Sequence, residues 1–417
     1  MNNKKAFFER SKIVLNKISP VYFISGYLLL VSLLTYIKIT PYDLNLSSLI
    51  GLWQGFANLN SHLIDNNFIV FYDGGYDGQF FYLISKQLFM NGLENLPILD
   101  SFFIRFNRLG LSLLAGTFSY VIGFQYYAII TLLVLHFIHL MAFILIRKIL
   151  SNENKYLSLY FLFSPFALNS NLLLVSDSLL ASFIVFSIYA LDKYTIIQVS
   201  QSTKKELSWS SLFLLLFILI FLCLIKESGI VILFSLLFVS LIENGTRNIF
   251  PILFSIILYL LIINLLKISI NPNPGTNPLS FLQLIDFPLF GFFKSIQFHP
   301  SMDIKSLFRE MAKFPVFIFF ILLTLNLLNI KTPRKLFLSI PILFVLFTSG
   351  IGEVGYWLSF DNISRMFTIS IPWIILLKED DSAHNDYYAL AFSIILLLLL
   401  IIRIVYIKTP MRYYFFQ

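Results

Sequence analysis

The chain has 417 residues, of which 58% are hydrophobic and only 12% are charged. Soluble globular domains carry about 25% charged residues, so this composition excludes a water-soluble fold and indicates an integral membrane protein. The net charge of +8 does not indicate nucleic-acid binding, because lysine and arginine of membrane proteins gather in cytoplasmic loops. We therefore expect no nucleic-acid partner.

Apolar runs of about 20 residues predict membrane-spanning helices. They predict an all-α polytopic protein whose residues 1–417 form a single transmembrane domain. The basic start of the chain, which lacks a small-residue cleavage site, predicts an uncleaved first span with a cytoplasmic N-terminus. About eleven spans are expected, over residues 20–38, 125–147, 156–171, 174–192, 209–225, 229–243, 249–267, 314–330, 336–353, 363–378 and 387–408.

Loop charge sets the expected orientation. Segment 108–124 is ambiguous, since it reads as a further span or as an interfacial or re-entrant piece. If it does not cross, the basic loops fall in the cytoplasm, as the positive-inside rule requires. Those basic residues are Arg147, Lys148, Lys155, Lys193, Lys204, Lys205, Arg247, Lys331, Arg334, Lys335 and Lys378. Two long segments, 39–124 and 268–313, are then expected outside, and loops of that length usually carry function.

The first of these segments contains "YDGGYDGQFFYLISKQLF", residues 72 to 89. Its glycines permit a tight backbone path. The pattern from Gln79 onward predicts a juxtamembrane helix with its apolar side toward lipid. Asp77 and Asp73 then have two interpretations. They are a helix cap and a turn former, or they are carboxylates held at the membrane surface to act on a substrate that is partly buried in lipid.

The stretch "YDGQFFYLIS" resembles the first-extracytoplasmic-loop signature of bacterial integral-membrane glycosyltransferases of the GT-C superfamily. That superfamily includes relatives of the dolichyl-phosphate-mannose-dependent mannosyltransferases. Asp77 matches the aspartate of the signature, and Tyr76, Gly78, Gln79 and Tyr82 occupy the surrounding positions.

Further stretches resemble the same superfamily in the expected order, so that the resemblance covers roughly residues 20 to 378. "RFNRLGLSLLAG" carries Arg105 and Arg108, and "SPFALNSNLLLVSDSLLASFIVFSIYAL" carries Asp177. "CLIKESGIVILF" contains a Lys226–Glu227 turn between two helices, which keeps both charges out of the membrane centre. "DNISRMFTISIPWIILL" begins with Asp361 and carries Arg365.

The resemblance implies a polyprenyl-phosphate sugar donor, membrane lipid as the surroundings, and transfer on the extracytoplasmic side of a bacterial plasma membrane. The acceptor is a glycan, a lipid or a protein of the cell envelope. Attack by an acceptor hydroxyl needs one general base, whereas the leaving phosphate needs cations rather than an acid. Unlike hydrolysis by two carboxylates, such transfer needs one catalytic carboxylate, and in-line attack inverts the anomeric centre.

These arguments assign expected roles to the site residues. Asp77 is the base and Asp73 the second catalytic candidate, which assists, binds the acceptor or contributes to a divalent-metal site. Arg365, Lys226, Arg105 and Arg108 are the donor-phosphate ligands. The substrate-binding candidates are Tyr76, Gln79, Tyr82, Asp177, Glu227, Glu353 and Asp361.

Each assignment has a structural alternative. Lys226–Glu227 reads equally as an ion-paired interfacial turn, Arg365 as a topological anchor and Asp177 as a helix cap. His136 and His139, three residues apart, suggest a metal, but without a neighbouring carboxylate, packing with interhelical hydrogen bonds is favoured.

Other functions stay open for the whole protein. A flippase or transporter of lipid-linked sugars would carry charges along a central path and show repeated halves, and neither pattern is visible. A polysaccharide polymerase or ligase would depend on arginine-rich late loops, whereas 268–313 is only mildly basic. A non-catalytic relative that acts as an interaction partner is the third alternative.

Overall fold

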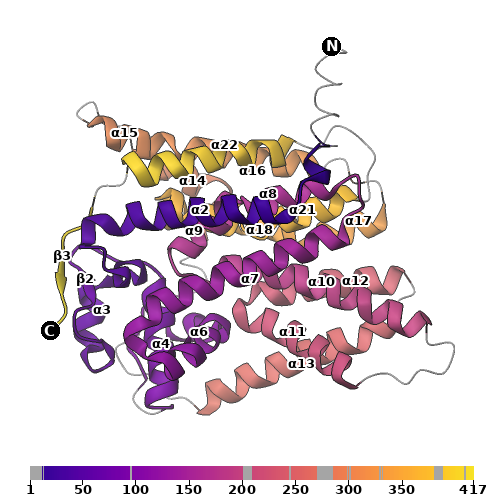
Figure 1. Ribbon diagram of the computed structural model, residues 1–417, viewed down its shortest axis with the longest axis horizontal. Coiled ribbons are helices and arrows are strands. Elements are labelled where there is room, and N and C mark those ends of the chain that lie inside the picture. Colours follow the sequence, from indigo (N-terminus) through magenta and orange to yellow (C-terminus); the bar gives the residue numbers. More distant parts are fainter. Residues whose placement is uncertain are drawn as a thin grey trace.

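The computed structural model describes residues 12, 14–93, 96–200, 209–243, 246–269, 285–297, 299, 302–327, 330, 332–379, 388–407 and 410–417 (Figure 1). Within these residues the chain is almost entirely helical. Its longer helices are α2 (Pro20–Ile39), α6 (Leu109–Ile122), α7 (Tyr127–Ile149), α10 (Asp177–Ser200), α11 (Trp209–Ile225), α12 (Ser228–Ile242), α13 (Thr246–Ser269), α16 (Lys313–Leu327), α18 (Ile340–Gly350), α21 (Ser370–Glu379) and α22 (Tyr388–Ile402).

Among the described residues, five helical segments are long and apolar enough to cross a membrane. They are Pro20–Tyr42, Phe124–Ile149, Asn248–Ile268, Ile304–Leu327 and Tyr388–Ile407. Shorter apolar helices cover Leu109–Ile122, Trp209–Ile225, Ser228–Ile242 and Ile340–Gly350. The expected class of helical membrane protein is thus confirmed, while the total of about eleven spans stays a prediction.

Three of the expected spans are not single helices. Residues 156–171 form a 3-10 turn (Lys155–Leu157), α8 (Ser158–Leu162) and α9 (Pro165–Leu172). Proline has no N–H to donate, so it starts a helix more readily than it continues one, and the Ser164 hydroxyl accepts from the Ala167 amide at 3.4 Å. Residues 336–353 divide into α17 (Pro333–Leu338) and α18, and the segment from 363 divides into α20 (Phe360–Met366) and α21.

The ambiguous segment 108–124 forms α6, which spans 14 residues. At about 1.5 Å per residue, such a helix is shorter than the hydrocarbon core of a bilayer, which is about 30 Å thick. Helix α6 packs against α4 (Gly78–Met90) and α7. Because α12, with 15 residues, is about as short and covers an expected span, whether α6 crosses stays a prediction.

The expected juxtamembrane helix forms as α4, but it does not present its apolar side to lipid. Phe80, Phe81, Tyr82, Leu83 and Ile84 are each 5% exposed or less. Consecutive apolar residues point around the whole helix, so they are buried only if protein surrounds it. Helix α4 is therefore a packed element of the first loop.

The rest of the first loop holds short elements: 3-10 turns at Thr40–Tyr42, Leu46–Ile50, Ser61–Leu63 and Phe124–Tyr126, helices α3 (Gln54–Leu59) and α5 (Phe102–Phe106), and strands β1 (Leu52–Trp53) and β2 (Ile69–Phe71). Strand β2 pairs in parallel with β1 and antiparallel with β3 (Tyr413–Phe415). The chain's last residues therefore lie against the first loop, at the end of the molecule opposite the start of α2 (Figure 1). The hydrophobic pattern did not predict this sheet.

The second long segment is partly helical. It contains α14 (Phe290–Ser295) and α15 (Ile304–Met311), and α15 runs into α16 ten residues before the expected start of that span. The proline-rich "NPNPG", together with Lys204, Lys205 and Lys331 of the basic loops, lies outside the described residues. Helix α19 (Val354–Trp357) and a π-helical turn at Arg403–Ile407 complete the described elements.

Gly78 has almost no space around its α-carbon. A methyl group there would lie 2.8 Å from the carbonyl oxygens of both Ile50 and Leu173. Backbone atoms cannot move aside as a flexible side chain can. The glycine after Asp77 is therefore needed for close approach of three backbone segments, and this contact sets the position of Asp77.

We predict that Gly78→Ala lowers the free energy of unfolding by about 1–3 kcal/mol, the usual cost of overpacking. Thermal unfolding of the detergent-solubilised protein measures this. Gly26→Ala is the matched control, because it lies within α2 and no atom comes within 4 Å of the added methyl. Equal melting temperatures for both variants would contradict the close-approach argument.

Candidate functional site

A cavity of about 420 Å³ opens where the ends of several helices meet. Its walls come from the start of α4, from α5, the start of α10, the α11–α12 turn, the end of α18, α19 and α20. Within the described chain, its charged lining residues are Asp77, Asp100, Arg105, Arg108, Asp177, Lys226, Glu227, Glu353 and Arg365. Segments up to 288 residues apart in sequence thus supply one polar site.

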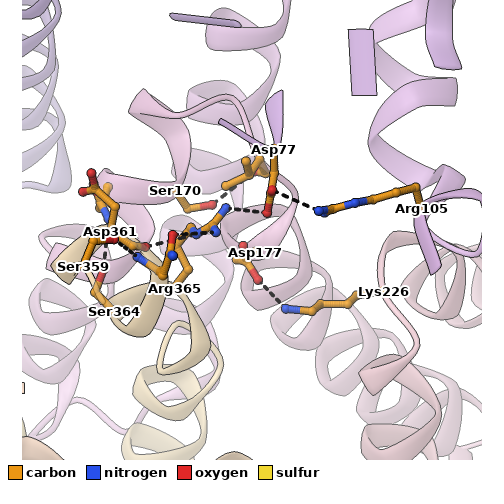
Figure 2. A network of polar contacts seen from close by, with 12 residues as sticks. Asp77, Arg105, Ser170, Asp177, Lys226, Ser359, Asp361, Ser364 and Arg365 are labelled. Carbon is orange, nitrogen blue, oxygen red and sulfur yellow. Dashed lines mark hydrogen bonds and ion pairs between the residues drawn. The ribbon is translucent and has the colours of Figure 1, made fainter. Parts of the chain in front are cut away.

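Asp77 is held by two arginines from different parts of the chain (Figure 2). Its Oδ2 accepts from Nη1 of Arg365 at 3.0 Å, and its Oδ1 lies 3.2 Å from Nη2 of Arg105. The side chain keeps 29% of its surface exposed. Although Asp77 precedes α4, its carboxylate makes no capping hydrogen bond to that helix. Asp77 thus occupies the N-cap position of α4, but its side chain does not cap the helix.

The charges around Asp77 determine its protonation. Burial by itself would raise the pKa of the Asp77 carboxyl, but attraction to Arg105, Arg365 and Arg108 outweighs burial and holds the pKa well below its ordinary value. Asp77 is consequently ionised and stabilised as an anion in the free protein.

The two arginines differ in how firmly they are held. Arg105 makes a bidentate contact with Asp100, at 3.0 and 2.8 Å, and its guanidinium lies 4.2 Å from the centre of the Phe80 ring. Arg365 donates from Nε to the carbonyl of Asp361 at 3.1 Å and from Nη2 to Asn362 at 3.5 Å. Asp77 is the carboxylate with which Arg365 pairs.

The Lys226–Glu227 turn contributes two further ion pairs, each to a different element. Lys226 Nζ donates to Asp177 at 2.7 Å (Figure 2). Arg108 donates to Glu227 through Nε and Nη2, at 2.8 and 2.5 Å. Burial raises the pKa of Glu227, but Arg108 and Lys226 outweigh it and lower that pKa to about 2. The interpretation of Lys226–Glu227 as an ion-paired turn therefore agrees with the structure. The two residues pair with Asp177 and Arg108, however, and not with each other.

Asp177 and Glu353 also line the cavity, in contrasting ways. The carboxylate of Asp177, the first residue of α10, is paired with Lys226. Glu353, at the start of α19, has no ion-pair or hydrogen-bond partner for its carboxylate in the part of the chain that the structure describes. Four basic and five acidic described side chains line the cavity, and Glu353 is the acidic one left over.

The second catalytic candidate lies elsewhere. Asp73 is 59% exposed and pairs with Arg412 next to β3, at 2.9 Å. It is not among the residues that line the cavity. Only three residues separate Asp73 from Asp77, yet the tight glycine-containing turn directs the two carboxylates to different partners.

Four of the substrate-binding candidates support the fold rather than line the cavity. Tyr76 packs its ring against Gly51 and under Lys38. Gln79 accepts from the Trp53 amide at 3.0 Å. The Tyr82 hydroxyl donates to Asp65 and to the Leu63 carbonyl, both at 2.9 Å. Asp361 forms a buried bidentate pair with Arg403, whose Nη2 contact is 2.9 Å.

Sequence reasoning missed Asp100 of the cavity wall and Arg403, the partner of Asp361 outside the cavity. Asp100 belongs to none of the motifs found in the sequence, and only the tertiary structure shows that it pairs with Arg105. Arg403 did offer a signal, because an arginine within an apolar run indicates a paired, often functional, charge. Its position in a π-helical turn is a second such indication.

The two histidines form a separate polar group. His136 Nδ1 lies 2.7 Å from the Tyr27 hydroxyl and 3.2 Å from Asn171, and His139 donates from Nε2 to the Leu162 carbonyl at 3.1 Å. No cluster of His, Cys, Asp or Glu that could hold a metal ion occurs among the described residues. The interhelical packing interpretation agrees with these contacts.

No model of a known protein family, no curated protein and no solved structure matches this chain. The function must therefore be inferred from the cavity and its charges.

The depressed pKa of Glu227 predicts a pH dependence. A carboxyl whose pKa is lowered by folding stabilises the fold above its unfolded pKa, about 4.3, and this contribution is lost as the pH falls toward about 2. Glu227→Gln should therefore melt at a lower temperature than the wild type near pH 7, with the difference narrowing below about pH 4. Thermal unfolding over a pH series measures it.

Glu243→Gln is the control for that series. Glu243 pairs with Arg334 at the surface, where both side chains are about half exposed (46% and 45%), and exposed pairs contribute little. Its curve should follow that of the wild type. A constant difference between Glu227→Gln and the wild type at every pH would rule out the linkage.

Proposed function

We propose that this protein is a GT-C-like membrane glycosyltransferase. It crosses a bacterial plasma membrane about eleven times and moves a sugar from a polyprenyl-phosphate donor to an envelope acceptor on the extracytoplasmic side. Its cavity is the active site. The observation that carries the proposal is the Asp77 carboxylate, which lies between two guanidinium groups in a cavity lined by further cations.

The reaction needs few groups, and the cavity contains them. An acceptor hydroxyl oxygen attacks the anomeric carbon of the donor while the bond from that carbon to the phosphate oxygen breaks. The hydroxyl proton passes to the Asp77 carboxylate. The electron pair of the broken bond remains on the departing polyprenyl phosphate, and Arg365, with Lys226, Arg105 and Arg108, stabilises the charge.

The ion pairs of the free protein bear on this chemistry. With both oxygens occupied, Asp77 is a weak base, and general bases work best when their pKa lies near the ambient pH. A donor phosphate that takes over the guanidinium of Arg365 removes one of these contacts. The pKa of Asp77 then rises, so the donor itself makes the base competent.

The unpaired carboxylate of Glu353 suits the acceptor. The Glu353 carboxylate needs hydrogen-bond donors, and the cavity cations cannot supply them because they are already paired with other carboxylates. Hydroxyl groups supply such donors without a charge. Glu353 therefore binds hydroxyls of the acceptor or of the transferred sugar.

We predict that Asp77→Asn abolishes sugar transfer, lowering it by at least about a hundredfold, because an amide cannot take up the acceptor's proton. Asp73→Asn should retain transfer, since Asp73 pairs with Arg412 outside the cavity. Mass spectrometry of envelope glycans from cells that carry each variant or no copy of the protein measures this. Glycans unchanged when the protein is absent would refute the transferase, and an active Asp77→Asn would remove Asp77 from the base role.

Arg365→Ala should raise the KM for the lipid donor roughly tenfold or more, since a charge-assisted contact to phosphate is lost. Steady-state kinetics in detergent, with donor concentration varied, measures the change. The Arg412→Ala variant controls for loss of a surface arginine that pairs with an aspartate outside the cavity. Unchanged donor kinetics in Arg365→Ala would exclude the phosphate role.

A further inference from the structure

One short turn carries Asp177 and contacts the two elements that carry Asp77 and Arg365. It comprises residues 169–178, the end of α9 and the start of α10, and we name it the α9–α10 turn. Asn169, Ser170 and Asn171 within it are 3% exposed or less. Burying polar side chains without partners is costly, so their hydrogen bonds indicate what the turn organises.

The first contact reaches α20. Asn169 donates from Nδ2 to the hydroxyl of Ser364 at 2.9 Å, and Ser364 is fully buried. Ser364 immediately precedes Arg365 in the same helix. Figure 2 shows Ser364 beside Arg365, whose guanidinium points toward Asp77. This hydrogen bond therefore fixes the part of α20 from which Arg365 extends.

The second set of contacts holds the start of α10. The Ser178 amide donates to the Ser170 hydroxyl at 3.0 Å, and the Ser178 hydroxyl donates to Oδ1 of Asn171. Ser178 follows Asp177 directly. The same turn thereby sets the position of the carboxylate that pairs with Lys226.

The third contact is made by the backbone. The Leu173 carbonyl is one of the two oxygens against which Gly78 packs, and Gly78 follows Asp77. The neighbouring Leu172 carbonyl accepts from Lys38 of α2. The α9–α10 turn thus contacts the chain directly beside Asp77, the residue that we propose as the base.

We propose that the α9–α10 turn is a positioning unit that sets the distance between the Asp77 carboxylate and the Arg365 guanidinium, with Asn169 acting through Ser364. The proposal rests on the proposed function, because the two groups are taken as base and phosphate ligand. Asn169 and Ser364 are not among the residues that line the cavity, so they are positioning residues. A displacement of about 1 Å in a reacting group can lower the rate on the order of a hundredfold. Loss of the buried hydrogen bond between Asn169 and Ser364 would therefore lower activity by displacing Arg365.

The test measures binding of a polyprenyl phosphate, the donor without its sugar, to the purified protein in detergent by titration calorimetry. Asn169→Ala and Ser364→Ala each remove the same hydrogen bond, so each should weaken binding roughly tenfold, and the double variant should be no worse than either. In an Arg365→Ala background, Asn169→Ala should have no further effect. A residue with only a structural role would not show this dependence.

Ser187→Ala is the matched control. Ser187 is also a fully buried serine, but its hydroxyl donates within α10 to the Phe183 carbonyl at 2.8 Å. It should bind polyprenyl phosphate as the wild type does. If Asn169→Ala does not fold, Ser364→Ala is compared with Ser187→Ala instead, because it removes the same hydrogen bond.

The outcomes separate the two proposals. A wild type that does not bind polyprenyl phosphate contradicts the proposed donor and hence the function. A wild type that binds, with Asn169→Ala and Ser364→Ala binding equally well, overturns the positioning role alone. Losses that add fully in the Arg365→Ala background also overturn it, because Asn169 would then act independently of Arg365.

Discussion

The double ion pair of Asp77 with Arg365 and Arg105 is the interaction on which the rest of the site depends. It joins the first loop to a helix 288 residues later in the chain. Removing one partner of such a partly buried pair leaves the other uncompensated, which costs more than the pair contributes. The contacts of Arg105 with Asp100, and of Arg365 with Asn362 and the Asp361 carbonyl, hold both arginines in place for this pairing.

The cavity is close to neutral before any ligand enters. Each of its described basic residues has an acidic partner, so an anionic ligand must replace a carboxylate rather than fill a vacant cationic pocket. In the proposed transferase, such replacement would link donor binding to the release of Asp77 as a base. It also favours ligands with a strong acceptor such as phosphate, whose oxygens compete well for guanidinium N–H groups.

The helical fold around the cavity is assembled from short, interrupted pieces. Pro165 and the Ser164 cap break one expected span into α8 and α9. The polar turn that follows contacts α20, α2 and the start of α4. The break thus brings polar groups together where the ends of helices expose backbone and charge.

The amino-acid sequence by itself determined the class of protein, the approximate extent of its apolar helices and the identity of most charged cavity residues. Composition and apolar run length suffice for the first two, because they reflect transfer from water to lipid, which depends on residue type alone. Asp77 and the Lys226–Glu227 turn stood out as charges in an apolar chain, and Asp177 and Arg365 were identified through the resemblance of their stretches to a known superfamily.

Only the tertiary structure decided how these charges pair and which of them lie outside the cavity. Asp73 and Asp77 occupy nearly identical motifs. Asp73 nevertheless pairs with Arg412, which precedes strand β3, whereas Asp77 pairs with Arg365. The reason is physical. Pairing depends on distances of a few ångströms between segments hundreds of residues apart, and local sequence carries no information about such contacts.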